Sequence, residues 1–274
     1  FKIEDDFVLD GEILIWDNLR NMPKDFSSLQ KRLGRKKPSH KIQSELEASF
    51  ISYDILELNG EDLRSNNQEK RRQLLENYFS TWRENNIDNF SNIIKLTGLH
   101  YLNDWDDVEG IKNLSRNNRT EGLVIKKRTS KYIPGRKEGH WWKYKVDPMQ
   151  LDAVLIYAKG GSGKRAGLYT DYSFALWDKD KLVKFTSAYS GLSNKEIKEL
   201  DKWIRTNTIE RFGPVRSVKP EMIFEISFEN IQPSKRHKSG IAVRFPRITK
   251  WRKDKLIQDA DHIKNAYELM NKVL

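Results

Sequence analysis

The sequence predicts an α+β fold in two domains, the second of which is a small β-barrel. Predicted strands and helices alternate through residues 1–148, which is typical of a mixed α+β domain. Asp147-Pro148 then interrupts the pattern, and short strands follow closely on one another through residues 149–274. At 274 residues the chain is at the upper limit for one hydrophobic core, so two domains are expected.

Hydrophobic periodicity identifies the elements of the first domain. Strands are expected where apolar and β-branched residues cluster, over residues 7–16, 49–58, 92–102, 121–128 and 141–146. Helices are expected over residues 25–33, 66–82 and 104–117. Asp25 or Ser27 caps the first helix, and the second carries apolar residues at helical spacing, with Trp82 near its end. Residues 35–41 are basic and predict a loop.

The second domain is built from short strands. They are predicted over residues 151–158, 165–178, 181–190, 222–231 and 240–248. One helix lies among them at residues 194–207, and another ends the chain at residues 259–274. About five strands with one inserted helix match a Greek-key barrel of the OB type.

Composition excludes several classes of site and indicates a polyanionic partner. The chain has no cysteine, which excludes disulfides and thiolate metal sites and fits a cytoplasmic protein. Its five histidines form no HxH or HxxxH pair, and no apolar run is long enough to cross a bilayer. Of the net charge of +11, residues 149–274 contribute most, with 24 Lys+Arg against 15 Asp+Glu. That half is expected to lie along a polyanion.

Five stretches carry residue types suited to phosphate chemistry. They are "LDGEIL" (9–14), "YDILELNGE" (53–61), "EGLVIKK" (121–127), "WWKYK" (141–145) and "RFPRITKWRKDK" (244–255). Glu12 and Glu121 offer carboxylate oxygens to a divalent ion. A single residue separates Lys143 from Lys145, so a strand places both side chains on one face. The ring of Tyr53 offers a surface for a base to stack on.

Each stretch alone is a weak signal, because an isolated Asp-Gly-Glu is usually a turn and an isolated Lys-x-Lys a solvated strand face. "AKGGSGKRAG" (158–167) is not a phosphate-binding P-loop, since Ala158 and Arg165 replace residues that such a loop requires. It is interpreted as a glycine-rich turn between two barrel strands. The five stretches acquire meaning from their order and spacing together.

In this order the five stretches resemble the third, "IIIa", fourth, fifth and sixth motifs of the covalent nucleotidyltransferases, which include ATP-dependent polynucleotide ligases and mRNA capping enzymes. "LNGE" and "RFPRITKWRKDK" are similar to ATP-dependent DNA ligases. "GLYTDYSFALWD", "ERFGPVRSVKPE" and "HKSGIAVRFPR" resemble a bacterial subgroup often found with a helicase and an exonuclease. The resemblance covers essentially the whole chain. It implies an N-terminally truncated adenylation (nucleotidyltransferase) domain over residues 1–148 and an OB-fold domain with a C-terminal helix over residues 149–274.

The resemblance also implies an activity, the sealing of nicks in duplex DNA, with ATP as the donor of AMP and with Mg²⁺. Glu12 would contact the nucleotide ribose or the metal, and Tyr53 would stack on adenine. Glu121 would hold Mg²⁺, while Lys143 and Lys145 would bind the nucleotide phosphates. In the barrel domain three further residues would orient the departing pyrophosphate, namely Arg252, Asp254 and Lys255. Arg136 would add one more phosphate contact.

The lysine that such enzymes use as nucleophile is missing from the sequence. In the family it lies in a Lys-x-Asp-Gly motif upstream of the Asp-Gly-Glu strand, and it attacks the α-phosphate of ATP to give lysyl-AMP and pyrophosphate. The AMP then moves to the DNA 5′-phosphate and is expelled by the 3′-hydroxyl. No Lys-x-Asp-Gly occurs in the 274 residues. We therefore expect the chain to be the C-terminal portion of a DNA ligase, and we expect that this chain alone cannot adenylate itself.

Two alternatives stay open at this stage, a non-catalytic OB-type nucleic-acid-binding module and an RNA ligase or capping-type nucleotidyltransferase. The carboxylates and the Lys-x-Lys pair argue against a pure binding module, because binding alone needs neither. The resemblance implies nicked duplex DNA as the substrate, a repair helicase or nuclease as partners, and a bacterial, nucleoid-associated location in the cytoplasm. A monomer without membrane association is expected.

Overall fold

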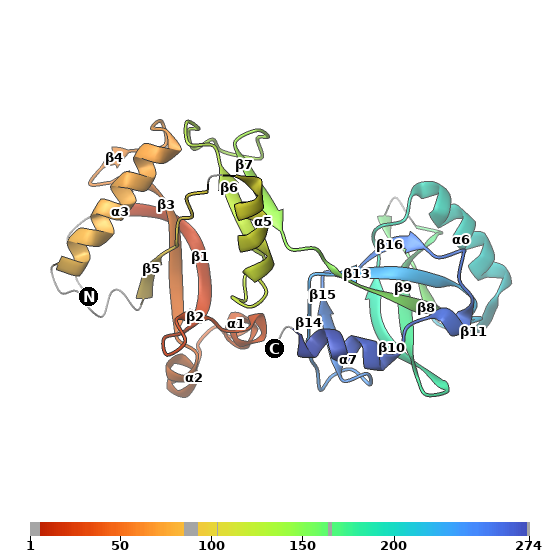
Figure 1. Ribbon diagram of the computed structural model, residues 1–274. Helices are drawn as coiled ribbons and strands as arrows, with labels where there is room; N and C mark the ends of the chain where they lie inside the picture. Colours follow the sequence, from red (N-terminus) through yellow and green to blue (C-terminus); the bar gives the residue numbers. More distant parts are fainter. Residues whose placement is uncertain (1–5, 85–92, 103, 164–165, 273–274) are drawn as a thin grey trace. The chain divides into compact units, whose positions relative to one another are not determined.

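The chain folds as two compact units, Phe1–Val146 and Asp147–Leu274. The computed structural model describes residues 6–84, 93–102, 104–163 and 166–272. Each unit has its own sheet and its own helices (Figure 1). The α+β prediction, with a barrel in the second unit, is confirmed.

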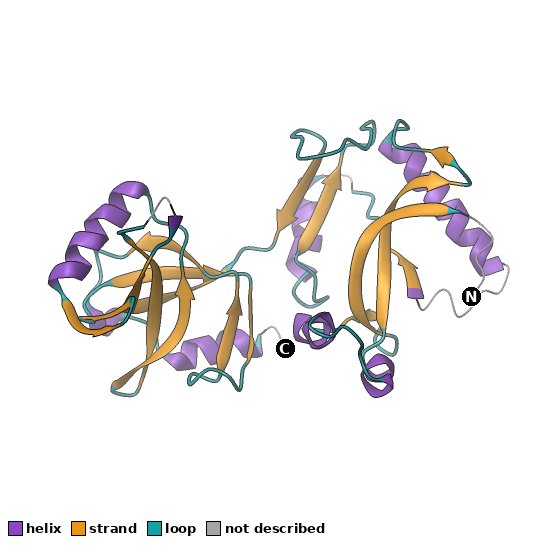
Figure 2. Cartoon of the chain, turned by 180° about the vertical axis from the view of Figure 1, so that it is seen from behind, coloured by secondary structure: helices purple, strands orange, loops and turns teal. Residues whose placement is uncertain are grey.

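A curved five-stranded sheet forms the centre of unit 1 (Figure 2). Its strands run in the order β2-β1-β3-β4, and β5 pairs in parallel with β3. The strands are β1 (Phe7–Asp17), β2 (Met22–Pro23), β3 (Ala48–Leu58), β4 (Glu61–Asp62) and β5 (Ile94–Leu96). Of the predicted strand over residues 92–102, only β5 is a strand, and residue 92 lies outside the described residues.

The "DGE" of the third motif (residues 10–12) lies inside β1 and is not a turn. A Cβ atom at Gly11 would lie 2.4 Å from the carbonyl oxygen of Ile51 and 2.6 Å from the ring of Phe50. The pairing register also shifts between Asp10 and Gly11. Glycine therefore lets β1 and β3 approach closely at the point where two carboxylates leave the strand.

In the part of unit 1 that the structure describes, four helices and a separate hairpin accompany this sheet. The helices are α1 (Phe26–Leu33), α2 (His40–Glu45), α3 (Gln68–Glu84) and α5 (Trp105–Leu114), and the hairpin pairs β6 (Gly122–Lys126) with β7 (Trp141–Lys145). Leu75 and Phe79 of α3 pack against Ile55 of β3 and form the core of the unit. The side chain of Trp82, expected on the same apolar face, lies outside the described residues. Helix α2 begins within the segment predicted as a loop, because Ser39 caps its first turn.

Seven strands of unit 2 form a curled sheet that closes much of a barrel, and two further strands, β14 and β15, pair only with each other among the described strands. The order is β10-β9-β8-β12-β11, and β13 joins β8 to β16. The strands of the unit are β8 (Met149–Gly160), β9 (Tyr169–Asp178), β10 (Lys181–Ala188), β11 (Thr208–Phe212), β12 (Val215–Val218), β13 (Ile223–Phe228), β14 (Asn230–Pro233), β15 (Ile241–Arg244) and β16 (Arg247–Trp251). A large aromatic and aliphatic cluster fills its interior.

The two helices predicted for unit 2 are present, and a short 3-10 turn that was not predicted precedes the second, which begins at Ile263 and not at residue 259. The elements are α6 (Asn194–Thr206), the 3-10 turn η2 (Ile257–Asp259) and α7 (Ile263–Asn271). Ser193 and Glu196 form a capping box that starts α6. The hairpin β11–β12 was not predicted, because most side chains of β11 are exposed and show no apolar alternation.

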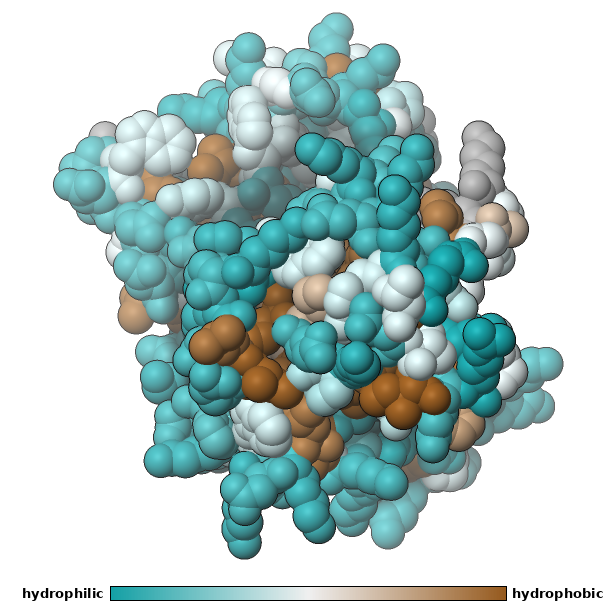
Figure 3. Space-filling view, turned by 90° about the vertical axis from the view of Figure 1, so that its right-hand side faces the viewer, coloured by the Kyte–Doolittle hydropathy of each residue, from teal (hydrophilic) through white to brown (hydrophobic). Residues whose placement is uncertain are grey.

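Figure 3 shows one face, on which hydrophilic groups surround separate hydrophobic patches. Among the helices of the described ranges, none combines the length and the apolar character that a membrane crossing requires.

Candidate functional site

Asp10 binds two tyrosines at the face of the β1–β3 pair. The hydroxyl of Tyr53 donates to Asp10 Oδ1 at 3.2 Å, and the hydroxyl of Tyr132 donates to Asp10 Oδ2 at 2.9 Å. Burial raises the pKa of Tyr53, and the nearby carboxylate of Asp10 raises it further. The charge of Glu12 acts in the same direction. Burial and the Asp10 hydrogen bond raise the pKa of Tyr132 to about 12. Glu12 therefore lies close enough to Tyr53 to act on it through its charge.

The β6–β7 hairpin presents Lys143 and Lys145 on one face. Cross-strand pairing sets Lys145 opposite Gly122 and Lys143 opposite Val124, and strand alternation turns both lysines to the same side. Lys145 Nζ lies 3.6 Å from Glu121 Oε2. A Cβ atom at Gly122, whose φ is +128°, would lie 2.2 Å from the carbonyl oxygen of Tyr144. Glycine is needed there to keep the fourth and fifth motifs in register.

Lys126 joins the hairpin to the Tyr53 face. It pairs across the strands with Trp141, so it lies on the same hairpin face as Lys143 and Lys145. Its Nζ lies 4.6 Å from the centre of the Tyr53 ring and 3.9 Å from that of Trp141. Burial lowers the pKa of Lys126 to about 8. Through this contact the face that carries the two motif lysines meets the half-buried ring of Tyr53.

Other predicted site residues of unit 1 are not brought together. No hydrogen bond or ion pair joins Glu12 to Glu121 within the described residues, and Arg136 is exposed in the loop between β6 and β7. No cluster of three or more Asp, Glu or His suited to a metal is found among the described residues. Mg²⁺ commonly binds one or two carboxylates together with substrate phosphates and water. Exposed carboxylates beside the lysine face fit that mode of binding, whereas a preformed cage of protein ligands does not occur there.

In unit 2, Arg252 and Lys255 share the carboxylate of Asp152. Arg252 Nη1 lies 2.9 Å and Lys255 Nζ 2.5 Å from Asp152 Oδ2. Arg252 also donates to both oxygens of Asp254, at 3.0 and 2.8 Å. This hydrogen-bonded pairing raises the pKa of Arg252 and lowers that of Asp254. The three residues of the sixth motif thus form one ion-pair network, held by a buried aspartate of β8.

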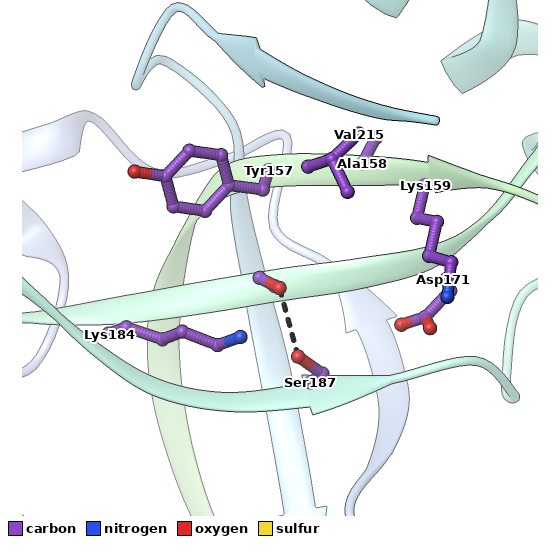
Figure 4. Close-up of a pocket in the computed structure, with 8 residues that line it drawn as sticks. Tyr157, Ala158, Lys159, Asp171, Lys184, Ser187 and Val215 are labelled. Carbon is purple, nitrogen blue, oxygen red and sulfur yellow. Dashed lines mark hydrogen bonds between the residues drawn. The ribbon is translucent and has the colours of Figure 1, made fainter. Parts of the chain in front are cut away.

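An open groove of about 250 Å³ lies on the outer face of the unit 2 sheet (Figure 4). Lys159 and Lys184 lie at its two ends, and the hydroxyls of Ser173 and Ser187 lie 2.9 Å apart on its floor. Tyr157 and Asp171 complete the polar lining. Both lysines are exposed. The groove can therefore offer ammonium and hydroxyl donors to an anion.

Sequence reasoning missed several side chains of these sites, among them Asp10, Lys126, Trp141, Tyr132 and Asp152. Asp10 and Lys126 lie within the quoted motifs. Lys126 follows Val124 by two residues, so strand alternation would have placed it on the same face as Val124, which lies opposite Lys143. Trp141 opens the fifth motif and shares the same alternation. Asp152 carries no local signal, because its partner Arg252 lies 100 residues away.

Comparison with known proteins identifies the family. The model described as ATP dependent DNA ligase domain matches residues 1–145, and that of the ATP dependent DNA ligase C terminal region matches residues 165–255. The chain belongs to the ATP-dependent DNA ligase family. ATP is accordingly the donor of AMP in this family.

Relatives of this ligase chain occur in bacteria and archaea. It is 34% identical to a probable DNA ligase of Koribacter versatilis, over 97% of the chain and 48% of that protein. It is 29% identical to a DNA ligase of Methanopyrus kandleri, over 98% of the chain and 47% of that protein. The chain thus spans about half the length of these relatives.

Solved structures share the fold. Pmar-Lig_PreS3 aligns with a TM-score of 0.66 at 18% identity, over 90% of the ligase chain and 51% of that structure. A structure from a study of Lig E DNA ligases aligns with a TM-score of 0.57 at 16% identity, over 89% of the chain and 76% of that structure.

Proposed function

We propose that the chain is the C-terminal portion of a ligase that seals nicks in duplex DNA, with its nucleotide site in unit 1 and pyrophosphate contacts in unit 2. The observation that carries the proposal is the meeting of the hairpin face bearing Lys143 and Lys145 with Tyr53. A stacking ring beside paired ammonium groups suits a nucleotide, since one part holds the base and the other neutralises its phosphates.

Each residue of unit 1 has a defined task in this proposal. Tyr53 stacks on adenine, and Glu12 accepts a hydrogen bond from a ribose hydroxyl. Lys143 and Lys145 bind the phosphates, as does Arg136 from its loop. Glu121 and Glu12 would hold Mg²⁺, which when bound supplies further neutralisation of phosphate charge.

In unit 2, Arg252 and Lys255 are proposed to neutralise the pyrophosphate. A guanidinium group has five N–H donors, and those of Arg252 that bind Asp152 and Asp254 hold the group in one orientation. The remaining donors are available for phosphate oxygens. Such preorganisation suits phosphoryl transfer, in which the protein acts mainly by positioning and by stabilising charge.

We further propose that the AMP-accepting lysine comes from another part of the full-length gene product, because the 274 residues contain no Lys-x-Asp-Gly. The intact mass of the chain after incubation with ATP and Mg²⁺ tests this. An unchanged mass is expected. A stable adduct with the mass of AMP would show that a lysine of this chain is the nucleophile.

Exchange of Glu121 for Ala tests the enzymatic role against a mere binding role. In the full-length gene product, sealing of nicked duplex DNA should fall by more than about 100-fold, as expected for the loss of a group that stabilises charge in the transition state. The DNA affinity of the chain should not change. Glu45→Ala, an exposed residue of α2, is the matched control and should seal normally. Equal sealing by both variants, or faster sealing of nicked RNA than of nicked DNA, would contradict the proposal.

A further inference from the structure

Lys126 holds its charge against aromatic rings instead of water. Its side chain is 15% exposed, and its Nζ lies 3.9 Å from the centre of the Trp141 ring and 4.6 Å from that of Tyr53. The one hydrogen bond found for it within the described ranges goes to the main-chain oxygen of Tyr53, at 3.4 Å. Ring faces thus take the place of most of the hydration shell of this ammonium group.

Within the described ranges, Lys126 shares its ion-pair partner with an arginine. Asp54 Oδ2 lies 3.9 Å away, but Arg71 already binds both oxygens of Asp54. The other charged groups that act on Lys126 are Asp10 on β1 and Arg72 on α3. A buried cation without its own counter-ion is unfavourable for folding. Such groups concentrate at functional sites.

The contacts of Lys126 form a closed circle around the Tyr53 ring. The Tyr53 hydroxyl donates to Asp10, which also accepts from Tyr132. The ring of Tyr132 packs edge-on against Trp141, with centroids 5.6 Å apart and planes at 79°. The ring of Trp141 in turn contacts the ammonium group of Lys126, which completes the set of contacts around Tyr53. Tyr53 is therefore held at its hydroxyl by Asp10 and over one ring face by Lys126.

We infer that Lys126 is a positioning residue for the nucleotide base, covering one face of Tyr53 and leaving the other face, in a fixed plane, for the base to stack on. The inference rests on the proposed function, since it concerns the base held by Tyr53. Only the protonated form makes a cation–π contact. Loss of the proton from Lys126 releases the ring and weakens binding of the base but not of the phosphates.

The test measures the affinity of the chain for ATP at pH 7 and pH 9, with inorganic tripolyphosphate as a probe that lacks a base. For the wild-type chain, ATP affinity should fall about 3- to 10-fold between pH 7 and pH 9, the range that one cation–π contact supports. Lys126→Met should bind ATP about 3- to 10-fold more weakly at pH 7 and show no further fall. Lys126→Arg stays charged and should retain its affinity at pH 9. Tripolyphosphate affinity should be the same in all variants at a given pH.

Lys127→Met is the matched control, because Lys127 is exposed and follows Lys126 in sequence, and it should behave as wild type. Tyr53 and Tyr132 do not confuse the pH profile, because burial and Asp10 raise the pKa of both above that range. Equal ATP affinity of Lys126→Met and wild type at pH 7, or the same pH profile for wild type and Lys126→Arg, would overturn the inference.

A second measurement separates failure of the inference from failure of the proposed function. If the wild-type chain binds no ATP, the proposed nucleotide site fails, and NMR of the Tyr53 ring then decides the inference alone. Ring resonances that shift between pH 7 and pH 9 in wild type, but not in Lys126→Arg, support it. Resonances that respond to neither the pH nor Lys126→Met overturn it.

Discussion

Arg71 and Asp54 form an ion pair in which both side chains are fully buried. Arg71 Nε lies 2.9 Å from Asp54 Oδ1, and Nη2 lies 3.0 Å from Oδ2. Arg71 also donates to the carbonyl oxygen of Asn66 at 2.6 Å and to Gln68 Oε1 at 2.8 Å. The pair ties α3 to β3 at the residue directly after Tyr53. It therefore fixes the strand position on which the candidate nucleotide site depends.

Arg71→Met should destabilise unit 1 by about 3–5 kcal/mol. It removes the guanidinium that binds both oxygens of the buried Asp54 carboxylate, and Lys126, 3.9 Å away, is then the nearest cation to it among the described residues. Urea unfolding compares the variants. The control Lys70→Met alters an exposed residue of the same helix and should change the free energy of unfolding by less than about 0.5 kcal/mol. The double variant Asp54→Leu/Arg71→Met should recover much of the loss, since the buried carboxylate is removed together with its guanidinium partner. A loss in Arg71→Met no larger than in Lys70→Met would show that the pair does not stabilise the unit.

Local patterns predicted most of the fold. The apolar spacing of α3 and the capping residues of α6 specify these helices without reference to the rest of the chain. The hairpin β11–β12 was not predicted, and most of residues 92–102 were wrongly predicted to be a strand. In the first case an exposed strand carries no apolar alternation, and in the second an apolar run is only partly paired, because β5 has one described neighbour, β3.

The motifs of the candidate site were found in the sequence, but the contacts between their side chains were not. Strand alternation sufficed to place Lys143 and Lys145 on one face. The roles of Asp10 and Asp152 depend instead on partners 43 and 100 residues away. Such contacts are set by the pairing of whole elements, and a single sequence does not report them.

Gly122→Ala should destabilise unit 1 by more than about 2 kcal/mol and separate the fourth and fifth motifs. The new Cβ would lie 2.2 Å from a main-chain oxygen, which cannot move as a side chain can, and φ of +128° disfavours alanine. Thermal unfolding measures the effect. Gly110→Ala, in the interior of α5 with no heavy atom within 4 Å of the added Cβ, should instead stabilise by up to about 1 kcal/mol. Similar changes in the two variants would refute the close approach of β6 and β7.

The stability of unit 1 should rise with pH between 8 and 10 because of Lys126. Its pKa is about 8 in the folded chain against 10.5 in the unfolded chain, so the unfolded chain binds more protons in this window and folding gains as pH increases. The gain over these two pH units is about 2 kcal/mol. Above pH 10 the raised pKa of Tyr132 and of Tyr53 acts in the opposite direction. Urea unfolding at pH 8 and pH 10 should therefore show the gain in wild type relative to Lys126→Met, and parallel pH dependences would disprove the burial of this charge.

Asp152→Asn should destabilise unit 2 by about 1–2 kcal/mol, because Arg252 and Lys255 lose the charge of the carboxylate that they share. Asp254→Asn provides the comparison. Its side chain is 56% exposed, so the loss of its charge should change stability less than Asp152→Asn does. Thermal unfolding of both variants decides. A larger loss in Asp254→Asn would mean that Asp254, and not Asp152, holds the sixth motif in place.

The groove of unit 2 should contribute to DNA binding through phosphate contacts. Each lysine that contacts a phosphate releases counter-ions, so its removal reduces the slope of log affinity against log salt concentration by about 1. Lys184→Ala should therefore weaken binding of nicked duplex DNA most at low salt and lower the slope by about 1, with no preference for base sequence. Titrations of the DNA between 50 and 200 mM salt, a range of about fourfold, measure both quantities.

Lys264→Ala separates a specific contact from general loss of charge. Lys264 is 82% exposed on α7 and pairs only with Glu268 among the described residues. Lys264→Ala therefore changes the net charge by the same amount as Lys184→Ala. If net charge alone attracts DNA, both variants lower affinity equally and leave the slope nearly unchanged. If Lys184 contacts a phosphate, only Lys184→Ala lowers the slope, because counter-ion release depends on contact and not on total charge. Ser187→Ala then tests the floor of the groove, since it removes a hydroxyl donor and should weaken binding without altering the slope.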